Sequence, residues 1–362
     1  MDTHFYALKI SNIKKETEDA VSVSFEVPDS LKDTFKYTQG QYLTLKFDLK
    51  GNEVRRAYSM SSSPLEKDLT VTVKRVSKGL VSNHIADKLQ VGDAVEIMPP
   101  AGRFYTPLAD TNRKHYYMIA AGSGITPIIS IIKTIMEVEP QSVVNLIYGN
   151  RMEEGIIFKE QLDLLQTKYA NQLYVEHVLS RPKGQKSGSF LGMFQKSTLS
   201  WQGKTGRINS AVLEKWLEEN PPIHKTVEYF ICGPNDMMAA AEQFLLARNT
   251  DKKHIHSEHF STSATEKSEN LAGSKLKVHL RGEEINLIAA PGKTILDMLI
   301  SEKKDPPYSC TSGACSTCMA KVTKGTVKMD ACFALDESEI KAGYVLTCQS
   351  HPTSPEVEII FE

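Results

Sequence analysis

Five of the six cysteines lie in the last fifth of the chain, and their spacing indicates metal chemistry. Four and then two residues separate Cys310, Cys315 and Cys318, and Cys348 follows after another 29 residues. The N-terminal residues show no basic stretch followed by an apolar core, so we expect no secretory signal and no disulfides. Closely spaced thiols in such a chain favour metal ligation. These four are the candidate ligands, whereas Cys332 fits no ligand position and is expected to be a small buried apolar residue.

The spacing of the four cysteines matches the known plant-type pattern for a [2Fe–2S] cluster, so the assignment is a match to a known pattern. Three thiolates on one loop can hold two irons only if the backbone closes around the sulfides, and Gly313 and Ala314 permit that approach. A zinc site with four cysteine ligands is the alternative, but it normally shows two Cys-x2-Cys pairs, and this segment has one. The segment therefore predicts an iron–sulfur cluster.

The residues around these cysteines resemble a known family. Tyr308-Ser309 precedes the first cysteine, and Leu346-Thr347 and Gln349 flank the last, as in plant-type ferredoxins. Residues 275–362 thus resemble a ferredoxin, which implies a ferredoxin-like β-grasp domain of the α+β class. Residues 261–274 before it are small and polar without periodicity, which predicts a flexible linker.

Residues 1–108 predict an antiparallel β-barrel. Short runs rich in β-branched and aromatic residues predict strands over Val21–Val27, Tyr42–Phe47, Ala57–Met60 and Leu69–Val76, with a short helix over Asn83–Leu89. The segment from Pro99 to Arg103 is not expected to continue a strand and would mark the exit of the barrel.

Residues 112–260 change to apolar strands alternating with helices, which predicts an α/β domain with a parallel sheet covered on both faces. The expected strands are Tyr116–Ala120, Val143–Tyr148, Leu173–Leu179 and Val227–Cys232, and the expected helices are Thr126–Val138, Ile157–Tyr169, Ala211–Glu218 and Pro234–Ala247. The uncharged stretch Tyr116–Ile132 is too short and too interrupted for a membrane span. Pro182–Thr205 is expected to be a long Gly/Ser/Lys-rich loop that is either functional or mobile.

Arg56-Ala57-Tyr58-Ser59, in the predicted barrel, carries residue types that suit a flavin. The Tyr58 ring could stack on the flat flavin ring, Ser59 could hydrogen-bond N5, and Arg56 could pair with the pyrophosphate. Four such residues alone could equally form a surface strand. Their place in the chain, however, resembles the RxYS signature of the ferredoxin-NADP reductase superfamily.

Two later segments resemble the same superfamily. Val73-Lys74-Arg75 resembles its flavin-edge strand, and Gly79-Leu80-Val81-Ser82-Asn83 resembles its GxxS segment, where N–H groups at a helix start hold phosphates. The resemblance implies FAD, with FMN as the alternative. The implied flavin-binding residues are Arg56, Tyr58, Ser59, Val73, Lys74, Arg75, Gly79, Val81 and Ser82.

Nicotinamide-type segments of the superfamily follow in the α/β part. The loop from Ala121 to Pro127 is not a GxGxxG fingerprint but resembles the GxGxTP loop. Later segments resemble the YGNR motif (Tyr148–Arg151), the CGP motif (Cys232–Pro234) and the ExF motif (Glu258–Phe260). The implied nicotinamide-binding residues are Gly122, Gly124, Thr126, Pro127, Arg151, Gly233, Pro234 and Phe260. Ser59, Cys232 and Glu258 are implied to be catalytic by positioning nicotinamide against flavin, although Cys232 could instead be a buried strand-end thiol.

Ser180-Arg181 follows the third predicted strand of the α/β domain, where the superfamily distinguishes NADH from NADPH. A cation there suits a 2′-phosphate, so NADPH is favoured. The long insertion after Arg181 departs from the short loop of the superfamily and leaves NADH open.

The order of flavin, nicotinamide and ferredoxin segments resembles the reductase components of multicomponent oxygenases, with the phenylacetyl-CoA epoxidase type favoured. It implies a cytoplasmic NAD(P)H oxidoreductase that passes electrons through FAD and the cluster to a terminal oxygenase or another one-electron acceptor protein. A reductase for a Rieske oxygenase or fatty-acid desaturase, and a non-catalytic redox-sensing protein, are the alternatives. The formal net charge of −1 indicates neither nucleic acid nor membrane as partner, and we expect a monomer.

Overall fold

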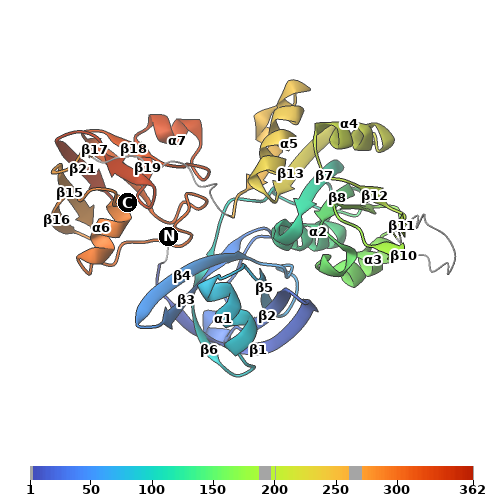
Figure 1. The fold of residues 1–362 in the computed structure, drawn as a ribbon, viewed down its shortest axis with the longest axis horizontal. Helices are drawn as coiled ribbons and strands as arrows, with labels where there is room; N and C mark the ends of the chain where they lie inside the picture. Colours follow the sequence, from blue (N-terminus) through green and yellow to red (C-terminus); the bar gives the residue numbers. More distant parts are fainter. Residues whose placement is uncertain (1–2, 187–196, 200, 261–270, 362) are drawn as a thin grey trace. The chain divides into compact units, whose positions relative to one another are not determined.

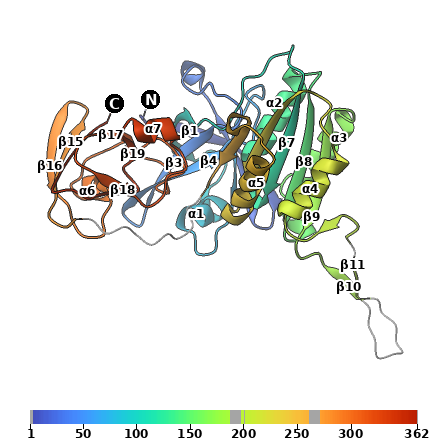
Figure 2. The same cartoon turned by 90° about the horizontal axis from the view of Figure 1, so that it is seen from above.

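The computed structural model describes residues 3–186, 197–199, 201–260 and 271–361 (Figures 1 and 2). The chain divides into two compact units. One unit comprises Met1–Phe5, Thr44–Ala57 and His259–Glu362, and the other comprises Tyr6–Leu43 and Tyr58–Glu258. In the ranges described, no helix is both long and apolar enough to cross a membrane.

The N-terminal sheet has the strand order β4-β3-β6-β1-β2-β5, and its described pairings β1–β2, β1–β6 and β2–β5 are antiparallel, which confirms the predicted barrel class. The strands are β1 (Tyr6–Thr17), β2 (Ala20–Glu26), β3 (Tyr42–Leu49), β4 (Asn52–Ser59), β5 (Leu69–Lys74) and β6 (Ala94–Ala101), and α1 (Leu80–Lys88) is the helix. Strand β1 was not among the predicted strands. Only Leu8 and Ile10 of its twelve residues are buried, so charged and polar side chains hide its pattern.

The prediction that the segment from Pro99 to Arg103 does not continue a strand was wrong for its first three residues, because β6 runs to Ala101, but the barrel strand does end within this segment. The register of β6 with β1 ends at Ile97, opposite Tyr6. The two prolines therefore lie past the paired stretch with β1, where a missing N–H costs no bond on that side.

A parallel sheet of order β12-β9-β8-β7-β13-β14 forms the α/β part, as predicted. Its longer strands are β7 (Lys114–Ala121), β8 (Val143–Asn150), β9 (Leu173–Leu179) and β13 (Thr226–Cys232). The helices are α2 (Ile125–Val138), α3 (Lys159–Lys168), α4 (Ser210–Glu219) and α5 (Asn235–Ala247). Alternate residues of β7 face opposite cores: Met118 packs with α2 and α3, and Ile119 packs with α4 and α5. Because helices cover both faces of this sheet, its strands are nearly continuous runs of apolar residues.

The insertion Pro182–Thr205 is not simply a loop. Strands β10 (Gly184–Lys186) and β11 (Ser197–Leu199) pair with each other, and β12 (Lys204–Thr205) adds an edge strand parallel to β9. These strands are two or three residues long, too short to leave a periodic pattern. Residues 187–196 and 200 of the predicted loop lie outside the described residues.

The C-terminal part has a mixed sheet of order β16-β15-β21-β17-β19, which is consistent with the predicted β-grasp class. Its strands are β15 (Lys275–Leu280), β16 (Glu283–Ile288), β17 (Met319–Lys324), β19 (Tyr344–Leu346) and β21 (Glu356–Ile360), and α6 (Ile295–Ser301) packs on its core. A second small sheet pairs β18 (Val327–Met329) with β20 (Ser350–Pro352), and α7 (Glu337–Lys341) lies between β18 and β19 in the chain. Most of the predicted linker, residues 261–270, lies outside the described residues.

Candidate functional site

Three residues that are distant in the sequence meet at the carboxyl end of the parallel sheet. Cys232, the last residue of β13, is in register with Ala120 of β7 and with Glu258 of β14 (Ile255–Glu258). Ser59 ends β4 of the barrel, and its Oγ donates a hydrogen bond of 2.8 Å to Glu258 Oε2. The structure thus brings together the three residues predicted to position the reacting groups.

The electrostatics of this site favour neutral side chains. Burial raises the pKa of Glu258 to about 8, and the hydrogen bond from Ser59 only partly opposes that rise. Burial, together with the nearby Glu258, also raises the pKa of the Cys232 thiol well above its usual value. At neutral pH Glu258 is therefore a carboxylic acid and Cys232 a thiol, so neither is set up as an anionic nucleophile.

The loop from Gly122 to Gly124 packs its backbone against the end of β13. A Cβ on Gly124 would overlap the carbonyl oxygen of Cys232, and one on Gly233 would come within 2.6 Å of Met237 Cε. The close approach at Gly124 is to backbone atoms, so only glycine fits there, whereas at Gly233 the flexible Met237 side chain could move. Thr126 is buried, and its hydroxyl donates to the Ser123 carbonyl, so its side chain shapes the loop.

The other predicted residues of this loop region also have structural places. Pro127 is buried in α2, and Pro234 precedes the first residue of α5. Phe260 is exposed and is the last described residue before 261–270, while the ring of His259 stacks on that of Phe333 at 4.1 Å.

The flavin-type residues line β5 and the start of α1. A Cβ built on Gly122 would lie 3.8 Å from Lys74 Nζ, and burial lowers the pKa of Lys74. Helix α1 starts after Gly79 without a side-chain cap, so its first N–H groups are available to an anion. Val81 is buried, and Ser82 Oγ accepts the Val76 N–H at 3.1 Å, which fixes the turn before the helix.

The remaining flavin-type residues differ in their surroundings. Arg75 pairs with Asp87 of α1. Val73 is buried in β5, and Tyr58 is half-buried in β4. Arg56 is exposed and donates to the carbonyl of Arg55 at 2.7 Å.

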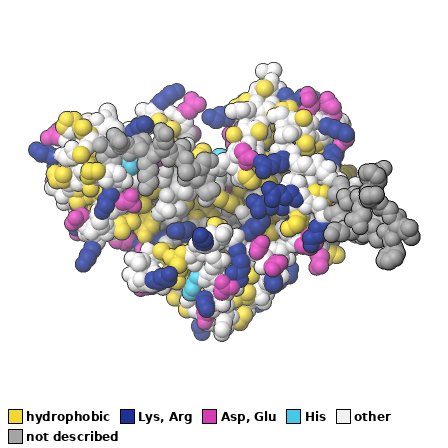
Figure 3. Space-filling model, viewed as in Figure 1, with side chains coloured by type: hydrophobic (Ala, Val, Ile, Leu, Met, Phe, Trp, Pro, Cys, Tyr) yellow, Lys and Arg dark blue, Asp and Glu magenta, His cyan; other side chains and the backbone are white. Residues whose placement is uncertain are grey.

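Three exposed arginines follow the neighbouring strands β8, β9 and β12 at the same end of the sheet. Arg151 follows β8, and its carbonyl accepts the Arg181 N–H at 2.8 Å after β9. Arg207 follows β12, two residues beyond that strand, and the N–H of Gly206 bonds to the Leu179 carbonyl. Sequence reasoning missed Arg207 because β12 was hidden in the insertion. Figure 3 shows a group of Lys and Arg side chains on one face of this domain.

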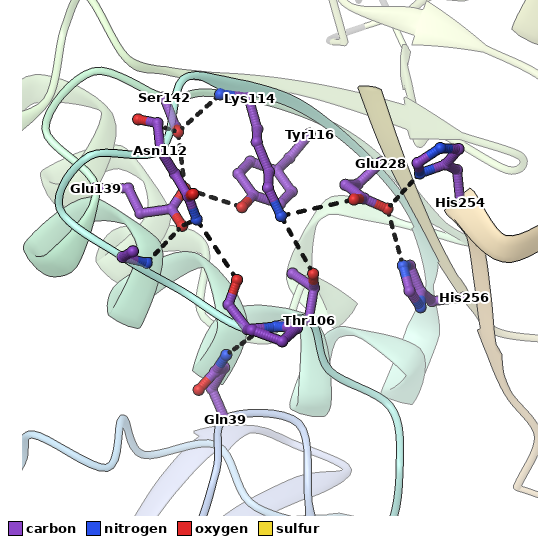
Figure 4. Close-up of polar contacts among 12 residues, drawn as sticks. Gln39, Thr106, Asn112, Lys114, Tyr116, Glu139, Ser142, Glu228, His254 and His256 are labelled. Carbon is purple, nitrogen blue, oxygen red and sulfur yellow. Dashed lines mark hydrogen bonds and ion pairs between the residues drawn. The ribbon is translucent and has the colours of Figure 1, made fainter. Parts of the chain in front are cut away.

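The opposite, amino-terminal end of the same sheet holds two carboxylates, Glu139 and Glu228, that accept hydrogen bonds from neighbouring side chains (Figure 4). Glu139 is fully buried and accepts hydrogen bonds from Tyr116 at 2.9 Å and from Ser142 at 2.7 Å. Glu228 accepts from His256 at 3.0 Å and from His254 at 3.2 Å. These contacts tie strand starts together at the end away from Cys232.

The four predicted ligand cysteines gather in the C-terminal domain as free thiols. Hydrogen bonds from Cys315 and Cys348 lower the pKa of Cys310, and the Ser312 N–H also donates to its sulfur at 3.4 Å. A hydrogen bond from Cys348 likewise lowers the pKa of Cys318. The same hydrogen bonds and burial raise the pKa values of Cys315 and Cys348. Four sulfurs close enough to share hydrogen bonds, with an N–H turned toward one of them, fit an iron cluster with sulfide bridges.

The geometry of the cluster loop explains the remaining residues of the segment. Gly313 has a φ of +70°, and a Cβ there would come within 2.8 Å of the Ala331 carbonyl oxygen, so the loop requires glycine. Within the described residues, no three His, Cys, Asp or Glu side chains surround a single-ion site. Cys332 is half-buried and packs against the cluster-side core, so the expectation that it is a buried apolar residue holds only in part.

Models of protein families match the chain in the predicted order. Residues 7–105 match an oxidoreductase FAD-binding domain, residues 118–243 an oxidoreductase NAD-binding domain, and residues 278–353 a 2Fe-2S iron-sulfur cluster binding domain. The fold and the site thus define an NAD(P)H oxidoreductase that uses FAD and a [2Fe–2S] cluster, as predicted.

Relatives are similar over the whole chain. One component of the 1,2-phenylacetyl-CoA epoxidase from Escherichia coli is 36% identical, covering 99% of this chain and 98% of that protein. The ferredoxin reductase component of 3-ketosteroid-9-alpha-monooxygenase from Rhodococcus rhodochrous is 34% identical, covering 98% and 96%. The chain therefore belongs to the family of reductase components of oxygenase systems. The solved phthalate dioxygenase reductase shares the fold, with a TM-score of 0.61, 22% identity and coverage of 99% of this chain and 98% of that one.

Proposed function

We propose that the chain takes a hydride from NADPH at the site of Ser59, Cys232 and Glu258 and delivers single electrons to a terminal oxygenase. The observation that carries the proposal is the hydrogen bond from Ser59 to Glu258. It joins a residue of the FAD-type segment to the strand beside Cys232, where the nicotinamide-type loop also ends. Bound FAD converts a two-electron hydride into single electrons, and a [2Fe–2S] cluster carries one electron at a time.

The proposed roles of the side chains follow from their positions. Ser59 and neutral Glu258 form a hydrogen-bonded pair that positions the reacting edge of the flavin, and Cys232 supplies a neutral contact beside the nicotinamide. Arg56, Tyr58, Val73, Lys74, Arg75, Gly79, Val81 and Ser82 would hold FAD. Gly122, Gly124, Thr126, Pro127, Arg151, Ser180, Arg181, Gly233, Pro234 and Phe260 would hold or shape the nicotinamide site, and Cys310, Cys315, Cys318 and Cys348 the cluster.

We further propose NADPH as the preferred donor. Arg181 offers the cation that a 2′-phosphate requires, and Arg151 and Arg207 follow the neighbouring strands. A 2′-hydroxyl would be served by an acidic residue instead. These arginines support NADPH over NADH.

The proposed domain limits are 1–108 for the FAD barrel, 112–260 for the nicotinamide domain, 261–274 for the linker and 275–362 for the ferredoxin domain. The barrel and nicotinamide domain suffice for hydride transfer, and the ferredoxin domain serves the acceptor. A cytoplasmic monomer is the form we propose for the enzyme.

We propose a phenylacetyl-CoA epoxidase-type oxygenase as the acceptor, because the relative named for that system is similar over nearly the whole of both chains. A steroid-type monooxygenase is the second candidate, supported by the relative from Rhodococcus rhodochrous. Both are oxygenases, so the identity of the acceptor changes the substrate and leaves the reductase chemistry the same.

The test is a coupled assay with purified protein. We expect one FAD, two irons and acid-labile sulfide per chain, and NADPH oxidation with ferricyanide as acceptor. Addition of the catalytic components of the epoxidase should then allow NADPH-dependent turnover of phenylacetyl-CoA, whereas a steroid oxygenase should be served poorly. A protein that binds the cofactors but does not oxidise NADPH or NADH with ferricyanide would instead be a non-catalytic redox protein.

A further inference from the structure

Arg55 lies at the contact of the β3–β4 hairpin with the ferredoxin domain. Residues Thr44–Ala57 and His259–Glu362 belong to one compact unit. Only 7% of the Arg55 side chain is exposed, although it is a cation. Its Nη2 lies 2.7 Å from Glu53 Oε1 in the hairpin and 3.0 Å from Asp305 Oδ1 in the ferredoxin domain. One guanidinium therefore bridges two segments that are 250 residues apart.

Aromatic rings complete the environment of Arg55. Its guanidinium carbon lies 4.1 Å from the centroid of Tyr308 and 4.9 Å from that of Phe5. The planar guanidinium can stack on rings while its edge donates to carboxylates, which a lysine ammonium cannot do. Burial alone would raise the pKa of Asp305, but the hydrogen bonds and charges of Arg55 and Arg281 lower it, so the carboxylate stays ionised.

The contact lies directly beside the cluster loop. Tyr308 is two residues before Cys310, and Ser309 is next to it in the chain. The hydroxyl of Ser309 shares a 2.7 Å hydrogen bond with that of Thr44 in β3, and both residues are almost fully buried. Each of the two residues before the first cysteine ligand is therefore held by the hairpin.

Strand β4 of the hairpin also contains the flavin-type segment, since Arg55 immediately precedes Arg56 in this strand. We propose that Arg55 is a positioning residue for electron transfer from flavin to cluster: by binding both Tyr308 and Asp305, it holds the segment that leads into the cluster loop against strand β4. The inference rests on the proposed flow of electrons from FAD to the cluster. Each transfer moves one electron from the reduced flavin to the oxidised cluster, and a one-electron acceptor protein then reoxidises the cluster.

The test compares Arg55→Ala, Arg55→Lys and Arg281→Ala in the full-length holoprotein. Arg281 is the matched control, because it bonds the other oxygen of Asp305 at 3.3 Å but is 57% exposed and lies within the ferredoxin domain. Rapid mixing with NADPH follows bleaching of the flavin and the cluster separately. Iron content, the electron paramagnetic resonance spectrum and the midpoint potential of the cluster are measured on each variant.

We expect Arg55→Ala to slow cluster reduction by at least about tenfold, since small misplacements of reacting groups have large effects on rates. Flavin reduction by NADPH, the resonance spectrum and the cluster potential should stay as in the parent. Arg55→Lys should restore the rate in part, and Arg281→Ala should match the parent. Because Arg55 is buried, the rate of cluster reduction in the parent protein should also change little in high salt.

Several outcomes would overturn the proposal. A parent-like rate of cluster reduction in Arg55→Ala would do so, as would an equal slowing of flavin and cluster reduction. If Arg55→Ala loses its cofactors, Thr44→Val serves as the second variant, because it removes only the hydroxyl bonded to Ser309. A parent-like rate of cluster reduction in Thr44→Val would count against the proposal that the hairpin positions the cluster loop. If NADPH reduces the flavin but never the cluster in the parent itself, the proposed function fails and not the role of Arg55 alone.

Discussion

The cluster site and the hydride site are built in opposite ways. Three of the four cysteines lie within nine residues of one loop, and their own spacing brings them together. Ser59 and Glu258 are 199 residues apart and meet only because a barrel strand ends beside the parallel sheet. The proposed cluster site gathers four thiols that hydrogen-bond one another, whereas the proposed hydride site buries a neutral carboxyl and a neutral thiol. Damage to one site should therefore leave the chemistry of the other intact.

The strongest test of this separation is Cys315→Ser. Removing a ligand thiolate should abolish electron transfer to cytochrome c, a one-electron protein acceptor, because the cluster can no longer be held in four thiolates. Reduction of ferricyanide, which accepts electrons at the flavin, should be largely spared. Steady-state rates with both acceptors and iron content measure the effect.

Cys332→Ser is the matched control for that variant, because Cys332 lies near the cluster but outside the ligand set. It should retain both activities and two irons. Loss of ferricyanide reduction in folded, FAD-containing Cys315→Ser would show that the two sites are not separable.

Within the hydride site, Arg181→Ala should affect NADPH far more than NADH. A charge-assisted hydrogen bond to a phosphate contributes about 1.5–3 kcal/mol, so KM for NADPH should rise roughly 10- to 100-fold. Arg248→Ala is the control, since Arg248 follows the last residue of α5 in the same domain and faces Glu214. An equal rise of KM for both donors would mean that Arg181 does not read the 2′-phosphate.

Glu258 should give flavin reduction a pH dependence that the cluster step lacks. Its pKa is raised to about 8, so the side chain is neutral below that pH and becomes an anion above it. A negative charge beside the site opposes the arrival of hydride, so the rate should fall about tenfold between pH 7 and pH 9. Rapid-mixing measurements with Glu258→Gln should show no such fall. A persistent decline in that variant would assign the pH dependence to another group.

The smallest kinetic effect is expected at the other end of the sheet. Glu139→Ala removes the acceptor of the buried Tyr116 hydroxyl and the shorter of the two hydrogen bonds that Ser142 donates, which should lower the free energy of unfolding by about 1–3 kcal/mol. The rate of flavin reduction should change less than about twofold, because only the distant strand starts are affected. Urea unfolding measures the stability. Glu137→Ala, at an exposed position of α2 two residues before Glu139, should change neither quantity.

Prediction from the sequence succeeded where local patterns suffice. The strands and helices of the α/β part were predicted because apolar runs that pack on two covered faces stand out from their flanks. Prediction failed where the structure depends on strand pairing that the local sequence does not show. Pro99 and Pro100 lie in strand β6, at a point where its pairing with β1 has already ended. Strand β12 has only two residues, so only its pairing with β9 identifies it, and Arg207 was missed with it.

The sequence by itself determined that the last domain carries a [2Fe–2S] cluster, and it also predicted the glycines of the tight loops and the order of the three domains, because these depend on spacing and residue type over short distances. Only the tertiary structure decided that Ser59 bonds Glu258, that burial keeps that carboxyl neutral at pH 7, and that Arg55 bridges Glu53 and Asp305. Each of these depends on burial and on contacts between strands far apart in the chain. Such contacts are set by the packing of whole domains, which no short window of sequence contains.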